Sequence, residues 1–495
     1  MYGAAASDVV RGVAHDVFKK GDSLAGGRYR LDSKIADGRF ASIWLGSDSA
    51  RSGAPVVLKL LESGDAPTYS AGAREAAAHT AAGRHPNIAR LLATFEHRSK
   101  GGRHACMVME PLGSSLEEAA ALCGGGLGMG LPLGAVRGAA RQALAALDHL
   151  HRQQRYAHMA VTPSNLLLDK PFRSLAPPPP SNPLEALWRS FQAAWGQVSN
   201  AAANPDPGVT AAAAAAAAAA STSGSGGNGG DSYSEASLSR AAVKLCDFGR
   251  ALPLDRLGEP QGREPLMIFA SPGYRPPEEV LGLEYRGPSY DMWNLGCTLF
   301  SLATGSDLFH PERGPSGADQ GEGQGPGSGR DGGSGGGGPA GGGGRRFWAE
   351  FDGNDAHLAQ MVATLGRIPR EMVKASPLRR VYFLPSGRLR VEARYDIERC
   401  PLAQLLAEGH GLEEDEAAGF AGFLAPLLEV APERRPSAAD MLRHKWLQEA
   451  KEDGGGDGGG KERMAAAGAA EPERDGAAQG DGKGTRRRGW WWGRR

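Results

Sequence analysis

The spacing of hydrophobic positions changes along this chain. Early segments contain short runs of branched apolar residues, and Val56–Leu61 and Ala105–Met109 are typical of buried strands. Another short strand is predicted at Ala242–Cys246, while much of the rest is rich in Leu and Ala at helical spacing. Because strands gather early and helices follow, the pattern predicts an α+β fold.

Three low-complexity segments interrupt this pattern. The first, 170–240, contains proline and alanine runs and a Gly/Ser stretch; the second, 314–346, is dominated by glycine; and the third is the tail 450–495. Such segments cannot bury enough apolar surface to offset the entropy of ordering them, so we expect disorder in all three. Without them about 340 residues remain, enough for one large domain over 21–449 that follows a short extension over 1–20.

One part of the first segment has a different pattern. Its apolar residues recur at steps of three and four and form one face of a predicted helix over 184–198. Asn182 is a suitable N-cap, and Pro183 suits the first helical position. Two interpretations remain open: this helix packs on the nearest surface of the domain, or it binds a partner. The face consists of Leu184, Leu187, Trp188, Phe191, Trp195 and Val198.

Composition narrows the cellular setting. Lys and Arg together number 56, as do Asp and Glu, so no overall charge favours nucleic-acid binding. The five cysteines are scattered and odd in number, which indicates reduced thiols rather than a disulfide framework. No run of about 18 apolar residues could cross a membrane, and the first residues lack the pattern of a signal peptide. We therefore expect a protein of the cytoplasm, the nucleus or both, with no transmembrane segment.

Candidate chemistry begins with a lysine inside a predicted strand. Lys59 lies among the branched apolar residues of Val56–Leu61, where an ammonium is costly to bury unless it is paired. Either Lys59 extends from the strand edge to solvent, or it meets an anionic ligand and a carboxylate partner. The upstream run Ile35–Leu45 contains Gly38, which by itself indicates only a turn.

Five further motifs follow in order. In His158–Asn165, the asparagine stands seven places after the histidine, with Ala160 and Thr162 between them. Asp247-Phe248-Gly249 comes directly after the predicted strand Ala242–Cys246. The remaining three are Tyr274–Glu278, Asp291–Gly296 and Pro432–Pro436.

In this order, the motifs resemble the catalytic loop, the metal-binding motif and the later signature segments of protein kinases. The resemblance implies a bilobal fold, with a small β-rich N-lobe over about 21–110 and a large, mainly helical C-lobe over about 111–449. It also implies ATP and Mg²⁺ as cofactors.

The resemblance assigns roles around the nucleotide. Lys59 would contact the α- and β-phosphates and pair with Glu75, although Glu75 taken alone also fits a solvated helix surface. Asp247 and Asn165 would hold Mg²⁺, a hard cation that prefers oxygen ligands. The glycine-rich loop and the hinge would supply the other nucleotide contacts, from Ala36, Gly38, Ile43, Met109, Glu110 and Leu112.

The same resemblance implies structural roles for three residues. Arg435 would form a buried ion pair with Glu278, and Asp291 opens the segment that corresponds to the central helix of the large lobe. Breaking a buried pair from one side costs several kcal/mol, so we expect these residues to support the fold rather than the reaction.

Within this superfamily, the chain most resembles the SR-protein kinases, serine/threonine kinases that phosphorylate Arg-Ser repeats of splicing factors. Gly102–Gly113 is similar to that family's approach to the hinge, and Glu416–Glu429 with His444–Leu447 to its last helices. The segment 170–240 falls where this family carries a large spacer. The resemblance implies Arg-Ser-rich proteins as partners, a monomer, and no nucleic-acid binding by the folded domain.

The catalytic loop departs from the kinase pattern at three positions. Met159 replaces an arginine that the SR-protein kinases also lack, so control by activation-loop phosphorylation is not expected. Ala160 replaces the catalytic Asp, and Thr162 replaces the catalytic-loop Lys. A methyl group cannot accept the proton of a substrate hydroxyl. We expect Mg-ATP binding to persist and phosphotransfer to be weak or absent. Two classes of function remain: a serine/threonine kinase with impaired catalysis, or an inactive pseudokinase that acts as a scaffold or allosteric partner.

Two charged segments allow more than one interpretation. Asp355 and Glu413–Glu416 either dock an Arg-rich substrate or form the solvated starts of helices. The end of the tail, Arg486–Arg495, combines arginine with tryptophan. It either binds an anionic membrane surface or RNA, or it is a solvated end.

Overall fold

The computed structural model describes residues 17–37, 41–61, 66–99, 102–123, 130–170, 238, 240–256, 272–283, 287–311, 353–394 and 397–448. Most of the three predicted low-complexity segments lies outside these residues. So do the helix predicted over 184–198, the turn residue Gly38, and the tail 450–495. The boundaries of the domain therefore stay predictions.

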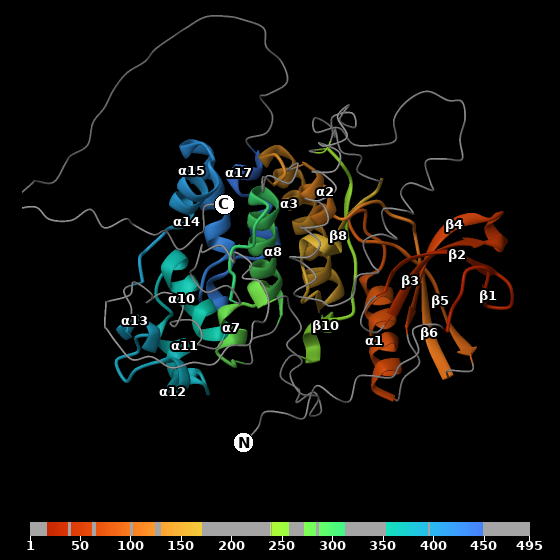
Figure 1. The fold of residues 1–495 in the computed structure, drawn as a ribbon, viewed down its shortest axis with the longest axis horizontal. Coiled ribbons are helices and arrows are strands. Elements are labelled where there is room, and N and C mark those ends of the chain that lie inside the picture. The colour runs from red at the N-terminus through yellow and green to blue at the C-terminus, as the bar shows by residue number, and fades with distance from the viewer. Residues whose placement is uncertain are drawn as a thin grey trace, which may run out of the picture.

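A six-stranded antiparallel sheet, in the order β1-β2-β3-β4-β6-β5, forms the N-terminal lobe (Figure 1). In β4, Val56, Leu58 and Leu60 are fully buried, while Lys59 points to the opposite face, as strand alternation requires. Helix α1 (Ala66–Ala82) packs on the sheet. The strands are β1 Ser23–Leu24, β2 Tyr29–Asp37, β3 Ala41–Asp48, β4 Ala54–Leu61, β5 Leu91–Ser99 and β6 Gly102–Met109.

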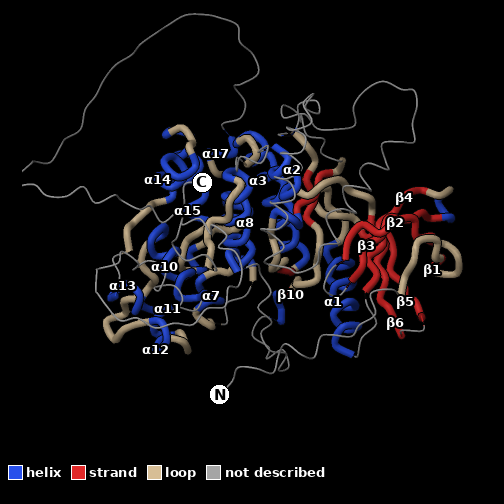
Figure 2. The backbone as a smooth tube through the Cα atoms, in the orientation of Figure 1, coloured by secondary structure: helices blue, strands red, loops and turns tan. Residues whose placement is uncertain are grey.

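Helices dominate the larger C-terminal lobe (Figure 2). Helix α8 (Pro288–Thr304) runs through its centre and is buried on almost all sides, because it is apolar around most of its circumference. The other helices are α2 Leu116–Cys123, α3 Leu133–Asp148, α7 Pro277–Val280, α10 Gly353–Leu365, α11 Arg370–Ala375, α12 Arg379–Tyr382, α13 Arg390–Arg394, α14 Leu402–Gln404, α15 Glu414–Leu427, α16 Ala438–Met441 and α17 Lys445–Gln448. This division into a small β-rich lobe and a large helical lobe confirms the predicted α+β, bilobal fold. No helix among the described residues is both long and apolar enough to cross a membrane.

Short strand pairs lie in the large lobe. β8 (Leu166–Leu168) pairs with β9 (Val243–Leu245), and β7 (Tyr156–Ala157) pairs with β10 (Leu252–Pro253). Segments from either side of 171–237 are thereby joined. As a result, the eight residues His158–Asn165, called the octet below, lie beside the segment that contains Asp247.

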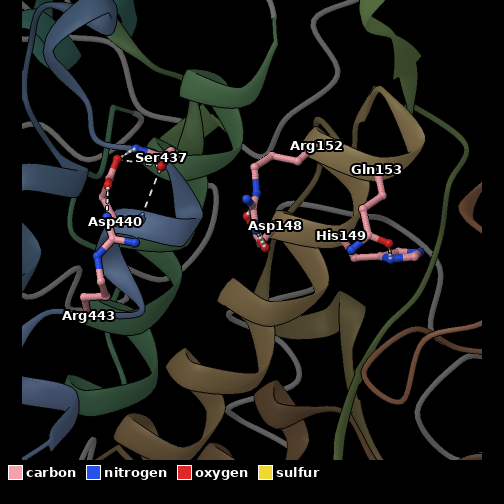
Figure 3. A network of polar contacts seen from close by, with 7 residues as sticks. All are labelled: Asp148, His149, Arg152, Gln153, Ser437, Asp440 and Arg443. Carbon is pink, nitrogen blue, oxygen red and sulfur yellow. Dashed lines mark hydrogen bonds and ion pairs between the residues drawn. The ribbon is translucent and has the colours of Figure 1, made fainter.

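Helix α3 ends in a π-helical turn over His149–Gln154 (Figure 3). At this end, Asp148 and Arg152 form an ion pair one turn apart, and Oε1 of Gln153 lies 3.0 Å from Nδ1 of His149. Arg155 then changes the direction of the chain with a φ of 58°. These contacts fix the end of α3 directly before the predicted catalytic loop.

Helix α16 packs beside α3 and begins with a side-chain cap (Figure 3). The hydroxyl of Ser437 accepts a hydrogen bond from the backbone N–H of Asp440, and the Asp440 carboxylate accepts one from the N–H of Ser437. Arg443 lies 2.5 Å from the same carboxylate. Both partners of this ion pair are exposed, so it adds little to stability.

A buried ion pair joins α7 to the chain after Pro432. Both Nη atoms of Arg435 lie 2.7 Å from the carboxylate oxygens of Glu278, and neither side chain is exposed. Arg435 also donates to the carbonyl oxygens of Glu429 and Ser289, and its guanidinium lies 4.9 Å from the ring centroid of Trp293. Burial raises the pKa of Glu278, while Arg435 opposes that rise.

We predict that Arg435→Met lowers the free energy of unfolding by about 3–5 kcal/mol, because it leaves the Glu278 carboxylate buried without a counter-charge. Thermal unfolding followed by circular dichroism measures the effect. Arg443→Met is the matched control, since it removes an exposed pair, and it should leave the midpoint nearly unchanged. Equal midpoints for the two variants would contradict the structural role of Arg435.

Candidate active site

Lys59 lies between two carboxylates from distant parts of the chain. Its Nζ is 2.6 Å from Oε1 of Glu75 in α1 and 3.0 Å from Oδ1 of Asp247, just after β9. The side chains of Lys59 and Glu75 are only 14% and 6% exposed, whereas that of Asp247 is 47% exposed. Glu75 is therefore buried, Lys59 is largely buried, and the two are paired, so the alternatives that placed Lys59 or Glu75 in solvent are wrong.

The electrostatics of this triad follow from burial and close charges. Burial alone would lower the pKa of Lys59, but Asp247 and Glu75 outweigh it and raise that pKa. For Asp247, burial alone would raise the pKa, but the charge of Lys59 lowers it to about 2 and keeps the carboxylate ionised. Burial raises the pKa of Glu75 to about 7, although the positive charge of Lys59 acts to lower it. The site thus holds a permanent ammonium beside a permanent carboxylate.

The backbone at Asp247 has an unusual conformation. Its φ is 64°, in the left-handed region that non-glycine residues seldom occupy. The N–H of Gly249 donates to Oδ1 of Asp247 at 3.2 Å, and a Cβ on Gly249 would lie only 3.2 Å from that oxygen and 3.4 Å from Oε2 of Glu75. Glycine therefore allows this turn to approach the triad closely.

A column of three rings links α1 to the octet. The ring of Phe248 stacks on that of His79 at 4.6 Å and meets the edge of His158 at 5.0 Å. Phe248 is 1% exposed, and burial lowers the pKa values of both histidines, which favours their neutral forms. Nε2 of His79 lies 2.6 Å from the carbonyl oxygen of Ala89. Sequence reasoning missed His79, although its place one helical turn after Glu75 is a usable signal.

Asp291 holds the backbone of the octet. Its carboxylate accepts hydrogen bonds from the N–H groups of His158 and Met159 at 2.7 and 2.6 Å. It also lies 2.8 Å from Nε2 of His151 and is fully buried. Met159 has a φ of 64°, so the anchored loop is also a strained one. The loop conformation therefore depends on Asp291 and not on the side chain at position 160.

Met159 occupies an apolar cluster. It is 7% exposed and packs with Ala157 and Tyr290, which Leu252 and Leu254 flank. A thioether here provides packing and no positive charge. The position therefore offers no cation to a phosphate group.

Among the remaining octet residues, Asn165 has a side chain that suits its predicted role as a metal ligand. Nδ2 of Asn165 donates to the carbonyl oxygen of Ala160 at 3.0 Å, and the backbone oxygen of Asn165 accepts from the N–H of Cys246 at 2.9 Å. Oγ1 of Thr162 lies 3.0 Å from Oγ of Ser164. Ala160 and Thr162 contribute neither a base nor a positive charge.

The predicted hinge follows β6. The Glu110 carboxylate accepts from Nζ of Lys244 at 2.6 Å and from the N–H of Arg90 at 2.8 Å, and the N–H of Gly113 donates to Leu168 at 2.8 Å. The Lys244–Glu110 pair thus ties β9 to the link between the lobes, a contact that sequence reasoning missed.

Three other predicted nucleotide contacts lie near this link or in the first strands. Ala36 on β2 pairs with Ile43 on β3, next to the undescribed turn at 38–40. Leu112 lies just beyond the hinge and is half-buried. Ala36 and Ile43 therefore flank the place of the predicted glycine-rich loop.

The acidic residues proposed for substrate docking lie at helix starts. Asp355 is in the first turn of α10, and Glu414, Asp415 and Glu416 form the first turn of α15 after Glu413. Carboxylates stabilise a helix N-terminus, which suffices to explain these positions. Substrate docking by them stays a prediction.

Comparison with known proteins supports the resemblance to protein kinases. A kinase-domain crystal structure has a TM-score of 0.55 at 21% identity and covers 87% of this chain and 98% of its own, so the fold is shared. The protein kinase domain profile matches residues 236–324. The serine/threonine-protein kinase SRPK of Physarum polycephalum is 27% identical over 425 residues, 85% of each chain. SRSF protein kinase 3 of Homo sapiens is 26% identical over 549 residues, 89% of each.

The chain has the protein kinase fold and is similar to SR-protein kinases over most of its length. In this kinase fold, Asp247 and Asn165 lie on neighbouring segments and present a carboxylate and an amide oxygen. These are the hard oxygen donors that Mg²⁺ takes together with phosphate oxygens. Among the described residues no group of three or more His, Cys, Asp or Glu could hold a metal by itself. The oxygen donors of Asp247 and Asn165 are of the kind that Mg²⁺ prefers.

Proposed function

We propose that this SR-protein kinase homologue binds Mg-ATP between its lobes and transfers phosphate weakly or not at all. The observation that carries the proposal is Lys59 held between Glu75 and Asp247, while Ala160 stands where the base should be. Because Glu75 already holds Lys59 in place for an anionic ligand, nucleotide binding requires no rearrangement of the Lys59–Glu75 pair.

Each charged residue has a distinct part in this proposal. Lys59 would orient the α- and β-phosphates, and Glu75 would keep Lys59 directed into the cleft. Asp247 and Asn165 would hold Mg²⁺, which, when bound, neutralises phosphate charge. Because Nδ2 of Asn165 donates to Ala160, its Oδ1 is left for the metal. The side chain of Asp247 is 47% exposed, so a ligand can reach its carboxylate.

The missing groups affect the reaction more than binding. A positioned general base contributes about 10²- to 10⁴-fold to the rate, which corresponds to about 3–5 kcal/mol of barrier. Thr162 in place of lysine also removes a positive charge from the transferring phosphate. Phosphoryl transfer depends chiefly on positioning and electrostatics, so a slow residual reaction is compatible with this site.

The relatives suggest the substrate. The human relative is described as an SRSF protein kinase, and we propose Ser or Thr in Arg-Ser-rich proteins as the acceptor for any residual activity. As part of the same proposal, the chain is a monomer of the cytoplasm or nucleus; its five free cysteines fit such a reducing compartment.

A second candidate is a pseudokinase that acts as a scaffold or allosteric partner. It is favoured by a specific combination: Asp291 still holds the octet backbone, although Ala160 and Thr162 no longer supply catalytic groups. A fold that binds nucleotide without turnover can still change its affinity for a partner.

We predict that millimolar Mg-ATP raises the thermal midpoint of the wild-type protein, because a ligand that binds only the native state stabilises it by about 2.7 kcal/mol at 100 times its Kd. Lys59→Met should lose most of this rise. Lys374→Met, which removes an exposed lysine far from the cleft, should keep it. Absence of any shift in the wild-type protein contradicts nucleotide binding.

We predict that Ala160→Asp increases phosphorylation of an Arg-Ser peptide by roughly 10²-fold or more, because it restores the base. Ala160→Asn is the matched control, since it has the same shape without a basic carboxylate, and it should stay at the wild-type rate. Incorporation of radioactive phosphate from ATP into the peptide measures the phosphorylation rate of all three proteins. A wild-type rate equal to that of Ala160→Asp refutes impaired catalysis.

A further inference from the structure

One exposed region of the large lobe is strongly basic, although the whole chain is neutral. Residues 367–399 contain nine Lys or Arg against four Asp or Glu. The charges of interest lie on α12, on α13 and on the turn between them, at the end of the large lobe away from the sheet (Figure 1). We call Arg379, Arg380, Val381, Arg388 and Arg390 the basic surface; all five residues are exposed.

The basic surface is rigidly mounted. Tyr382 and Phe383 are each 3% exposed and anchor α12 in the core. Phe383 forms an isolated bridge with Leu389, and the N–H of Leu384 donates to the carbonyl oxygen of Arg388 at 2.9 Å. Gly387, with a φ of 84°, closes this tight turn. The surface is thus pre-organised, so little entropy is lost when a ligand binds it.

Carboxylates near the basic surface are already engaged. Glu371 pairs with Lys374 at 3.2 Å, and Oε2 of Glu392 accepts from the N–H of Leu389 at 3.0 Å. Nε of Arg390 donates to the carbonyl oxygen of Arg380 at 3.2 Å, a contact that leaves both positive charges in place. Within the described residues, Arg379 and Arg380 have no ion-pair partner. The positive charges of Arg379 and Arg380 are therefore left for an anion to neutralise.

An exposed apolar residue directly follows two of these arginines. Val381 is 54% exposed and follows Arg379 and Arg380 directly. Among the described residues, Leu122 is the other large hydrophobic side chain that is exposed. Arginine forks bind carboxylates in a bidentate manner, and arginine clusters recognise acidic motifs. An apolar residue inside such a cluster adds contact area that a simple polyanion does not use.

We propose that the basic surface docks an acidic protein segment that carries an apolar residue, with the carboxylates on the arginines and the apolar side chain on Val381. An Arg-rich segment is excluded from this place by like charge, so this partner differs from an Arg-Ser-rich acceptor. The docking does not depend on nucleotide in the cleft and goes beyond the kinase function proposed for the site.

Fluorescence anisotropy with a labelled peptide of alternating Glu and Asp around one Leu tests the proposal on the full-length protein. Arg379→Glu/Arg380→Glu should weaken binding about tenfold or more, with the largest effect at low salt. Arg51→Glu/Arg84→Glu is the matched control: it changes net charge equally, at exposed arginines of the small lobe, and should bind as the wild type does. Thermal unfolding verifies that both variants fold.

A second pair of measurements tests the apolar part. Val381→Ser should weaken binding of the Leu-containing peptide several-fold. It should leave the affinity for a peptide with Ser in place of Leu unchanged. The proposal is overturned if the two double variants bind equally, or if Val381→Ser has no effect. It is also overturned if a single-stranded oligonucleotide binds the wild type more tightly than the acidic peptide, since the surface is then a general polyanion site.

Discussion

The charges of Lys59, Glu75 and Asp247 meet where three separate parts of the chain converge. Nearly all the geometry of the candidate site depends on them, because a buried ammonium requires counter-charges and each counter-charge fixes an element. Glu75 fixes α1 against the sheet, and Asp247 fixes the segment after β9. The ring column of His79, Phe248 and His158 then extends this arrangement from α1 to the octet.

The backbone of the octet, His158–Asn165, is held by a residue outside it. Asp291 binds two backbone N–H groups, so the loop conformation is specified by hydrogen bonds that any residue could donate at positions 158 and 159. Ala160 takes no part in these hydrogen bonds with its side chain. On the proposed function, the backbone scaffold is therefore separate from the group that would act as a base, and the fold can persist whether or not that base is present.

The sequence was informative where function depends on residue type in a fixed order. The strand around Lys59, the α+β fold and the SR-protein kinase resemblance could all be predicted, and the fold and the resemblance are confirmed. The roles assigned to Asn165, Asp247 and the hinge stay predictions. Contacts that join residues far apart could not be predicted: the Lys244–Glu110 pair spans 134 positions, and its partners carry no local signature. Likewise, the positive φ of Met159 follows from anchoring by Asp291, which no local propensity indicates.

A crystal structure of the full chain with Mg²⁺ and a non-hydrolysable ATP analogue would show whether the charged residues still hold nucleotide although Ala160 provides no base. We predict an occupied site between the lobes, with Nζ of Lys59 on the α- or β-phosphate, Glu75 still paired with Lys59, and the metal bound by oxygens of Asp247 and Asn165. Next to the γ-phosphate, the methyl of Ala160 should face the acceptor side. An empty cleft at saturating nucleotide, or phosphates that lie away from Lys59 and Asp247, would contradict this prediction.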